Sequence, residues 1–220
     1  MSQITPHTIQ FLKDLSQNND REWYNTHKKA AQQARTDWAT FVDGVIDRLR
    51  DKAELGSVQA KQCVFRLQRD VRFSKDKTPY NPHFSAYITA QGKKTPKAGL
   101  FFRIKPDGSS LLGGGLWHGD GPTLAAIRQE IDYCGDEWHA ILNAAGFKKR
   151  YGTIEGEQLK RPPKGYTADH PNIDHLRHKQ WLASIEITES QYTSATFAHY
   201  IEESYDDLKP FLDFLNRVFD

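Results

Sequence analysis

The spacing of the large apolar residues changes twice along this chain, and that change most constrains its fold. Between residues 20 and 51 these residues recur three, four or seven positions apart, which predicts one long amphipathic helix. They are Trp23, Ala30, Ala34, Trp38, Phe41, Val45 and Leu49. A shorter helix is expected after Thr5 and Pro6, because Thr caps free amides and Pro suits a first helical turn. Helical spacing returns from Pro122, ends at Gly146 and resumes in a last helix, which Pro210 is expected to kink or divide.

The middle third of the chain has the two-residue period of half-buried strands. Apolar residues alternate with polar ones over residues 65–73, which predicts a strand. Arg69 falls on the apolar side, so either the strand bulges near Gln68 or the guanidinium is buried against a carboxylate. Further strands are expected at 84–89, 100–105 and 181–187, with a hairpin turn at 106–108. This pattern predicts an α+β fold with one mostly antiparallel sheet packed by N-terminal and C-terminal helices.

Length and composition limit the class of protein. A chain of 220 residues with 38% hydrophobic residues can bury one core, so we expect a single domain over 1–220. A formal net charge of +2 is too small for a protein that coats nucleic acid, so any basic function is local. The two cysteines, Cys63 and Cys134, are too few for a disulfide framework. With no long apolar segment, we expect a cytoplasmic protein without a membrane partner.

Three separated motifs resemble one known family. They are R-D-V-R-F-S-K-D-K-T-P-Y at 69–80, G-G-G-L-W at 113–117 with L-x-x-I-R after it, and L-K-R-P-P-K-G-Y-x-x-D-H-P from 159 with L-R-x-K. In this order they resemble the bacterial family catalogued as domain of unknown function 2461. The resemblance implies one domain and supplies no activity. The positions that match the family's motifs are Arg69, Asp70, Arg72, Phe73, Lys75, Asp76, Lys77, Pro79, Tyr80, Arg128, Lys160, Arg161, Lys164, Asp169, His170 and Arg177.

The first motif holds the strongest candidate site. Its cations suit an oxyanion, because Arg binds carboxylate or phosphate through two parallel hydrogen bonds and Lys supplies a movable charge. The expected anion contacts are Arg69, Arg72, Lys75 and Lys77. Asp70 and Asp76 are candidates for general acid and base, or for holding Mg²⁺ with substrate oxygens. The alternative is that both carboxylates neutralise these cations in a network that only stabilises the fold.

The later basic motif supplies a second group of candidates. Lys160, Arg161 and Lys164 surround two prolines, so this loop is either a stiff lid that closes on a ligand or a solvated surface loop. We expect Tyr166 and Arg177 to contribute ligand contacts. His170, beside Asp169, is the other catalytic candidate, as a proton shuttle near neutral pH or as a helix cap.

Other chemistries fit the sequence less well. The run Gly113–Gly115 matches no dinucleotide or phosphate-loop motif, so it indicates close approach to another backbone or to a ligand. Trp117, which follows it, lines a pocket or belongs to the core. The acidic and histidine residues of 169–178 lack the spacing of a metal site, and no metal is assigned. No motif of a covalent hydrolase is present.

These observations favour a protein that binds a small phosphorylated or carboxylated ligand, and they leave open whether it is an enzyme. One alternative is a nucleic-acid-binding module in which the same cations meet phosphates and Tyr80, Trp117 and Tyr166 stack on bases. A second alternative is a non-catalytic protein whose charges form a structural ion-pair network. The anion hypothesis requires the cations of 69–77 and 160–164 to converge on one pocket. Cofactor, substrate and oligomeric state are not predicted.

Overall fold

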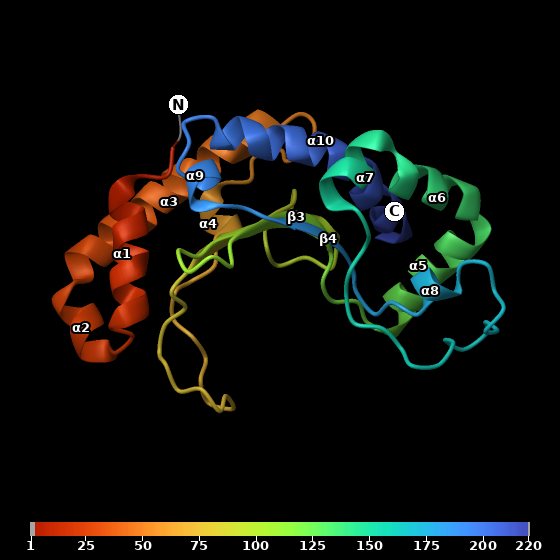
Figure 1. Ribbon diagram of the computed structural model, residues 1–220, viewed down its shortest axis with the longest axis horizontal. Coiled ribbons are helices and arrows are strands. Elements are labelled where there is room, and N and C mark those ends of the chain that lie inside the picture. The colour runs from red at the N-terminus through yellow and green to blue at the C-terminus, as the bar shows by residue number, and fades with distance from the viewer. Residues whose placement is uncertain (1–2, 220) are drawn as a thin grey trace. The chain divides into compact units, whose positions relative to one another are not determined.

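The computed structural model describes residues 3–219, which form helices and one sheet (Figure 1). The helices are α1 (Pro6–Gln17), α2 (Arg21–Thr26), α3 (Lys28–Leu49), α4 (Ala60–Cys63), α5 (Gly121–Tyr133), α6 (Gly135–Asn143), α7 (Ala145–Tyr151), α8 (Ile173–Leu176), α9 (Glu189–Tyr192) and α10 (Phe197–Asn216), with a 3₁₀ turn η1 at Arg217–Phe219. The strands are β1 (Phe84–Ile88), β2 (Gly99–Ile104), β3 (Leu111–Leu116) and β4 (Trp181–Glu186). Helices pack against the sheet, so the predicted α+β class is confirmed.

The four strands lie in sequence order, β1-β2-β3-β4, in one antiparallel sheet. Side chains alternate between its faces, and on β1 and β2 every even-numbered residue is a buried hydrophobic one. The predicted strands at 84–89, 100–105 and 181–187 are therefore confirmed to within a residue, and the turn at 106–108 joins β2 to β3. The described residues group into two compact units. Unit 1 comprises residues up to 94, 101–112 and 186–203, and unit 2 comprises 95–100, 113–185 and the rest.

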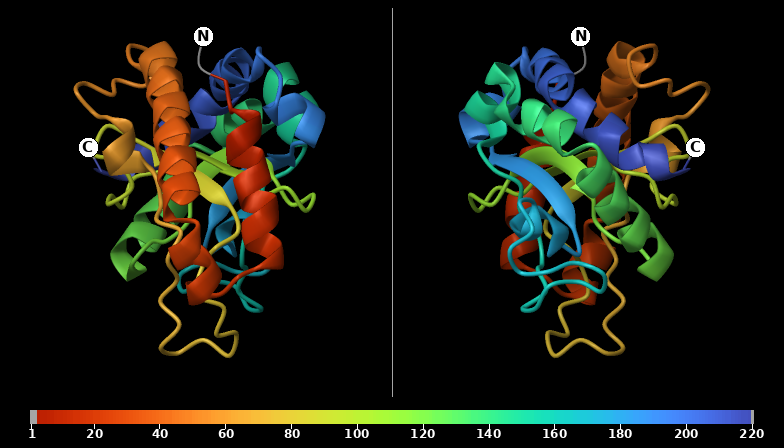
Figure 2. Two further views of the ribbon diagram at one scale, coloured as in Figure 1. Left: turned by 90° about the vertical axis from the view of Figure 1, so that its left-hand side faces the viewer. Right: turned by 90° about the vertical axis from the view of Figure 1, so that its right-hand side faces the viewer.

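Unit 1 is built on the N-terminal helices, of which α1 and α3 lie side by side (Figure 2). Thr5 caps α1 by accepting a hydrogen bond from the Thr8 amide, as expected. The single helix predicted over 20–51 is wrong. It is interrupted at His27, where the backbone leaves helical geometry and both the amide and ring Nδ1 donate to the Trp23 carbonyl. Below the break, Trp38 stacks on Phe84 at 5.6 Å and anchors α3 on the sheet.

The strand predicted over residues 65–73 is wrong as well. Of its four apolar residues only Leu67 is buried, whereas Phe65 and Phe73 are exposed. Only isolated bridges occur here, Val64 with Ala86 and Gln68 with Tyr80. The segment instead forms one side of an extended arm that leads from α4 into β1, drawn in orange and yellow in Figures 1 and 2.

Unit 2 packs α6, α7 and the later part of α10 around an aromatic cluster, in which Trp138 contacts Phe211 and Phe214. Gly146 does not end a helix as predicted. It lies inside α7. Glycine is needed at this position because a side chain would collide with the Asp207 carboxylate. Helix α10 runs from Phe197 to Asn216 with Pro210 inside it, so Pro210 does not divide the helix.

Candidate functional site

The arm comprises residues 64–83, and two antiparallel segments form its base. The Phe65 amide donates to the Ser85 carbonyl at 3.0 Å, and the Asn81 amide donates to the Leu67 carbonyl at 2.7 Å. The Arg69 amide donates to the Pro79 carbonyl at 2.9 Å and closes the paired region. Residues 70–78 beyond this point form the tip of the arm. The base is therefore a narrow two-stranded ribbon that holds the tip in place.

Arg69 organises the tip of the arm. Its guanidinium pairs with the Asp76 carboxylate and donates to the Thr78 hydroxyl and, at 3.1 Å, to the Thr78 carbonyl. The Thr78 amide and then Arg69 lower the pKa of Asp76 to about 2, so this carboxylate is ionised near neutral pH. Of the two explanations for Arg69, pairing with a carboxylate is the one that the structure shows. The ion pair between Arg69 and Asp76 thus fixes the positions of both side chains.

The remaining charges of the tip also have partners, with one exception. Arg72 donates to both Asp70 oxygens, at 2.9 and 2.7 Å, and this pairing lowers the pKa of Asp70. Lys77 Nζ donates to the Val71 carbonyl at 3.0 Å. Among the described residues, Lys75 has no acidic partner. Three of the four predicted anion contacts are therefore engaged within the arm, and two of them, Arg69 and Arg72, are paired with the carboxylates that the ion-pair alternative names.

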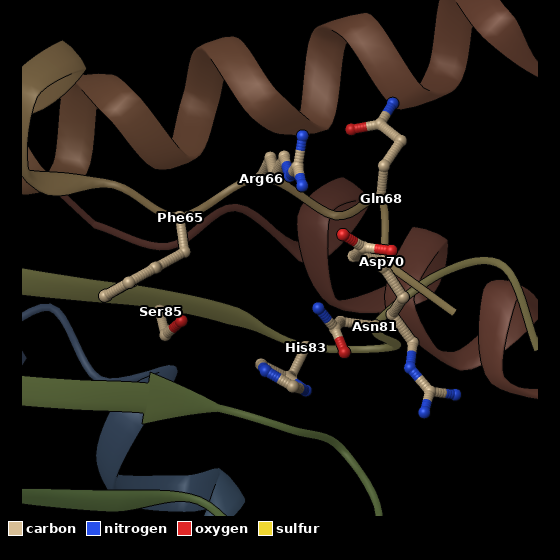
Figure 3. Close-up of a pocket in the computed structure, with 8 residues that line it drawn as sticks. Phe65, Arg66, Gln68, Asp70, Asn81, His83 and Ser85 are labelled. Carbon is tan, nitrogen blue, oxygen red and sulfur yellow. The ribbon is translucent and has the colours of Figure 1, made fainter. Parts of the chain in front are cut away.

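A pocket of about 330 Å³ lies beside the base of the arm (Figure 3). It is lined by Phe65, Arg66, Gln68, Arg69, Asp70, Asn81, His83 and Ser85. Figure 3 shows Phe65 above Ser85, Arg66 and Gln68 at the upper edge, and His83 below Asn81. Of the predicted site residues only Arg69 and Asp70 line this pocket.

His83 is the most perturbed group of the pocket. Burial, followed by the charges of Arg103 and Lys105, lowers its pKa to about 4, so the imidazole is neutral near pH 7. Arg103 lies on β2, and its guanidinium donates twice to the Ser109 carbonyl, at 3.2 and 2.9 Å. Lys105 pairs with Asp107. The field at His83 is therefore positive, which favours an anion over a cation.

Two guanidinium groups near the pocket form no direct ion pair, although the Arg66 charge also helps to lower the pKa of Asp70. Within residues 3–219, neither Arg66 nor Arg103 has an acidic side chain within salt-bridge distance. Arg66 lies at the pocket edge and Arg103 acts on His83 from β2. Such groups bind carboxylate or phosphate in a planar, two-bond geometry. The pocket can therefore hold an oxyanion next to a neutral imidazole.

Sequence reasoning missed the groups that distinguish this pocket, above all His83 and Arg103. A signal was available in the strand period: Ser85 on β1 and Arg103 on β2 are both odd-numbered, and His83 directly precedes β1 in the same alternation. With the even-numbered residues buried, the odd set shares the other face. The assumption that 65–73 is itself a strand drew attention to the tip instead.

Unit 2 holds the other predicted contacts. Lys160, Arg161 and Lys164 are exposed, and the Tyr166 ring packs edge-on against His170 at 5.4 Å. Arg177 approaches Asp174 at 3.6 Å. Residues 69–77 belong to unit 1 and residues 160–177 to unit 2, and a single pocket shared between them stays a prediction.

His170 is held by a partner other than the expected Asp169. Its Nε2 lies 2.9 Å from Asp132 Oδ1, and its Nδ1 accepts from the Asn172 amide at 3.0 Å. Because Nδ1 accepts, Nε2 carries the proton and donates to Asp132. Asp169 instead bonds Thr167, which lowers the Asp169 pKa. Both ring nitrogens of His170 are therefore engaged, so proton transfer to a ligand would first require breaking one of these bonds.

The predicted aromatic contacts divide between the units. Tyr80 is buried in unit 1 and stacks on Tyr24 with ring centroids 4.1 Å apart. Trp117 is 55% exposed, so of its two alternatives, pocket lining and the core, the second is wrong. Gly113 and Gly115 pass so close to the β4 backbone that a side chain would collide with it. The glycine run therefore serves strand packing.

Two wider features complete the description. No helix within residues 3–219 is both long and apolar enough to cross a membrane. In the same part of the chain, no three His, Cys, Asp or Glu side chains are grouped as metal ligands.

Fold and site together define an α+β protein with a four-stranded antiparallel sheet and a basic pocket at the base of an extended arm. The chain belongs to the family described as conserved hypothetical protein (DUF2461), which matches residues 7–214 and confirms the resemblance seen in the three motifs. Comparison with the curated proteins gives no match, and neither does comparison with the solved structures.

Proposed function

We propose that the pocket at the base of the arm binds a small anionic ligand that carries a phosphate or a carboxylate. The observation that carries the proposal is that Arg66 lines the pocket without a direct ion pair among the described residues, next to a neutral His83 whose pKa is lowered by burial and by Arg103. An anionic ligand would be attracted to this partly desolvated pocket, where electrostatic interactions are stronger than in water.

The size and walls of the pocket support a small ligand. A volume of about 330 Å³ is at the low end for ligand sites in proteins. Phe65 is 42% exposed and packs edge-on against Phe101, which gives the pocket an apolar wall. Asn81 and Gln68 add amide groups that can donate or accept hydrogen bonds. This combination suits a ligand with an anionic end and a less polar body.

The proposal keeps the expected ligand class but changes the residues that bind it. Arg72 and Lys77 are replaced as principal contacts by Arg66, which lines the pocket, and by Arg103, whose charge acts on His83, because neither Arg72 nor Lys77 lines the pocket. Asp70 and Asp76 are ionised and paired, which makes them poor general acids. If the pocket is catalytic, the neutral imidazole of His83 is the better general base. Cys63 and Cys134 are both free, which suits a cytoplasmic location.

Thermal unfolding in the presence of single ligands tests the proposal. The probes are inorganic phosphate, a nucleoside monophosphate, a sugar phosphate and a dicarboxylate. A ligand that binds only the folded protein stabilises it by about 2.7 kcal/mol at a concentration of about 100 Kd. We expect at least one probe to raise the melting temperature in proportion to the logarithm of its concentration.

Charge-removing variants locate the site. Arg66→Gln and Arg103→Gln should each abolish most of the ligand-induced rise in melting temperature. Arg35→Gln is the matched control, because Arg35 is an exposed arginine of α3 away from the pocket. Equal ligand-induced shifts in the wild type, Arg66→Gln and Arg103→Gln would contradict the proposal, as would no shift with any probe.

A further inference from the structure

The tip of the arm displays an apolar side chain that the pocket does not use. Phe73 is 97% exposed, more than Phe65, Trp117 or Tyr133, which are the other large apolar residues exposed among those described. It lies in the middle of the tip, and the Arg72 guanidinium lies 5.9 Å from its ring centroid. An aromatic ring held this far into solvent gains nothing for folding. Its position therefore suits a contact with another molecule.

The charge around Phe73 favours an anionic partner. The two carboxylates of the tip, Asp70 and Asp76, are each paired with an arginine. Lys75 has no acidic partner among the described residues, and Lys77 keeps its charge while it donates to the Val71 and Arg72 carbonyls. The tip therefore carries two lysines without an acidic partner among the described residues, both close after the exposed ring in the sequence.

The tip is also preorganised. Arg69 bonds Asp76, Thr78 and Ser74, so the loop is held by a side chain that leaves Phe73 free. Lys77 adds two further bonds to backbone carbonyls. A loop that is already ordered loses less conformational entropy when it binds. The hydrogen bonds of Arg69 and Lys77 thus explain how the exposed ring and its neighbouring cations keep a defined arrangement.

We propose that the tip of the arm binds single-stranded nucleic acid, with Phe73 stacked on a base and the cations around it facing phosphates. Stacking on an aromatic ring and contact of lysine or arginine with the backbone are the two elements of such binding. The proposal rests on residues outside the pocket and does not depend on the small-anion function.

A membrane surface fits this tip less well. Insertion requires the aromatic ring to lie some 5–10 Å below the level at which cations meet lipid phosphates. The Arg72 guanidinium stays against the Phe73 ring, and the paired carboxylates Asp70 and Asp76 lie within three residues of it. These charged groups would be drawn in with the ring at a cost in desolvation. On an unpaired strand, bases and phosphates alternate at short distances, and no such separation is needed.

Fluorescence anisotropy of a labelled mixed-sequence oligonucleotide of about 16 nucleotides tests the proposal with the full-length protein. We expect binding at about 50 mM salt that weakens steeply toward about 200 mM. Phe73→Ala should weaken binding about 5- to 100-fold, the effect of losing one base stack. Lys75→Gln should reduce the slope of log affinity against log salt by about one.

The matched control is Tyr133→Ala, which removes another exposed aromatic ring, at the end of α5 in unit 2. It should leave oligonucleotide binding unchanged. Phe73→Ala should also leave the melting temperature and the phosphate-induced shift unchanged, because Phe73 packs on no core residue and does not line the pocket. If the protein binds the oligonucleotide but not phosphate, the small-anion proposal for the pocket is contradicted and the proposal for the tip is not.

Three outcomes would overturn the proposal. The first is no oligonucleotide binding by the wild type at low salt. The second is equal affinity of the wild type and Phe73→Ala. The third is Phe73-dependent binding to vesicles that contain phosphatidylserine without binding to the oligonucleotide, which would make the tip a membrane contact. A duplex of the same sequence should bind more weakly than the single strand, because its bases are already stacked on one another.

Discussion

Arg69 and Asp76 stand seven residues apart and form an ion pair that closes the loop at the end of the arm. The side-chain exposures of 22% for Arg69 and 60% for Asp76 show that the arginine is the inner partner. Thr78 joins them, since its amide donates to Asp76 and its hydroxyl and carbonyl accept from Arg69. The cations of the first motif therefore do not all serve the same purpose. Arg69 is a structural residue that orders the loop.

Replacing Arg69 should loosen the tip without unfolding the protein. Arg69→Ala removes the bonds to Asp76, Thr78 and Ser74, so residues 70–78 lose their internal support. We expect trypsin to cleave after Lys75 and Lys77 several times faster than in the wild type, with little change in melting temperature. Arg35→Ala is the control for removal of an exposed arginine. Unchanged cleavage at the tip would show that Arg69 does not order it.

Reversing the charge of Arg72 should not destabilise the fold. The side chain is 76% exposed and its one acidic partner within residues 3–219, Asp70, is also exposed, so water replaces the lost pair at little cost. We expect Arg72→Glu to melt within experimental error of the wild type. A large fall in melting temperature would favour the alternative in which the charges of the first motif stabilise the domain.

Stability should depend on pH through His83. The folded-state pKa of about 4 lies below the value of 6.5 for a free histidine, so between these values the unfolded chain binds the proton. The contribution of His83 to stability is therefore present above about pH 6.5 and is lost as the pH falls toward about 4. Its size is on the order of 2 kcal/mol.

Urea unfolding at several pH values, for the wild type and His83→Gln, measures this contribution. The difference between the two free energies of unfolding should shrink by roughly that amount as the medium is acidified. Groups other than His83 titrate in both proteins and cancel in the difference. A difference that stays constant from pH 6.5 to pH 4 would show that burial and the neighbouring cations do not hold His83 neutral.

The glycine run can be tested through strand packing. A methyl group at Gly113 would collide with the Ala183 carbonyl and with Ser184 on β4, so the strands must move apart. We expect Gly113→Ala to destabilise the protein by about 1–3 kcal/mol or more. Gly121→Ala is the control, because no atom lies within 4 Å of the added methyl group. Equal stability of the two variants would show that the approach to β4 is looser than described.

The fold was largely accessible from the sequence because its helices and strands have strong periods. The strands that contain Phe84, Leu100 and Trp181 were placed correctly, since apolar residues occupy every second position of each strand. The long helix was misjudged at His27, where apolar spacing continues across a break that only the non-helical backbone angles of His27 reveal. Periodicity reports which face is apolar and does not report whether the backbone is continuous.

The candidate site was less accessible because local alternation has more than one structural meaning. Phe65 and Phe73 alternate with charged residues as a half-buried strand would, yet both are exposed on the arm. Which cations remain uncompensated depends on contacts such as that between Arg72 and Asp70, which composition does not determine. His83 acquires its low pKa from burial and then from the charge of Arg103, a residue that only the pairing of β1 and β2 brings near.

The central claim is that an anion occupies the pocket beside His83, and a titration of the His83 ring by NMR tests it most directly. The His83 resonance is assigned by its loss in His83→Gln, and its pKa is measured with and without inorganic phosphate. A bound anion stabilises the imidazolium, so phosphate should raise the pKa from about 4 toward 6.5 in the wild type and much less in Arg66→Gln. A pKa that does not move at saturating phosphate, or that moves equally in both proteins, would contradict the account.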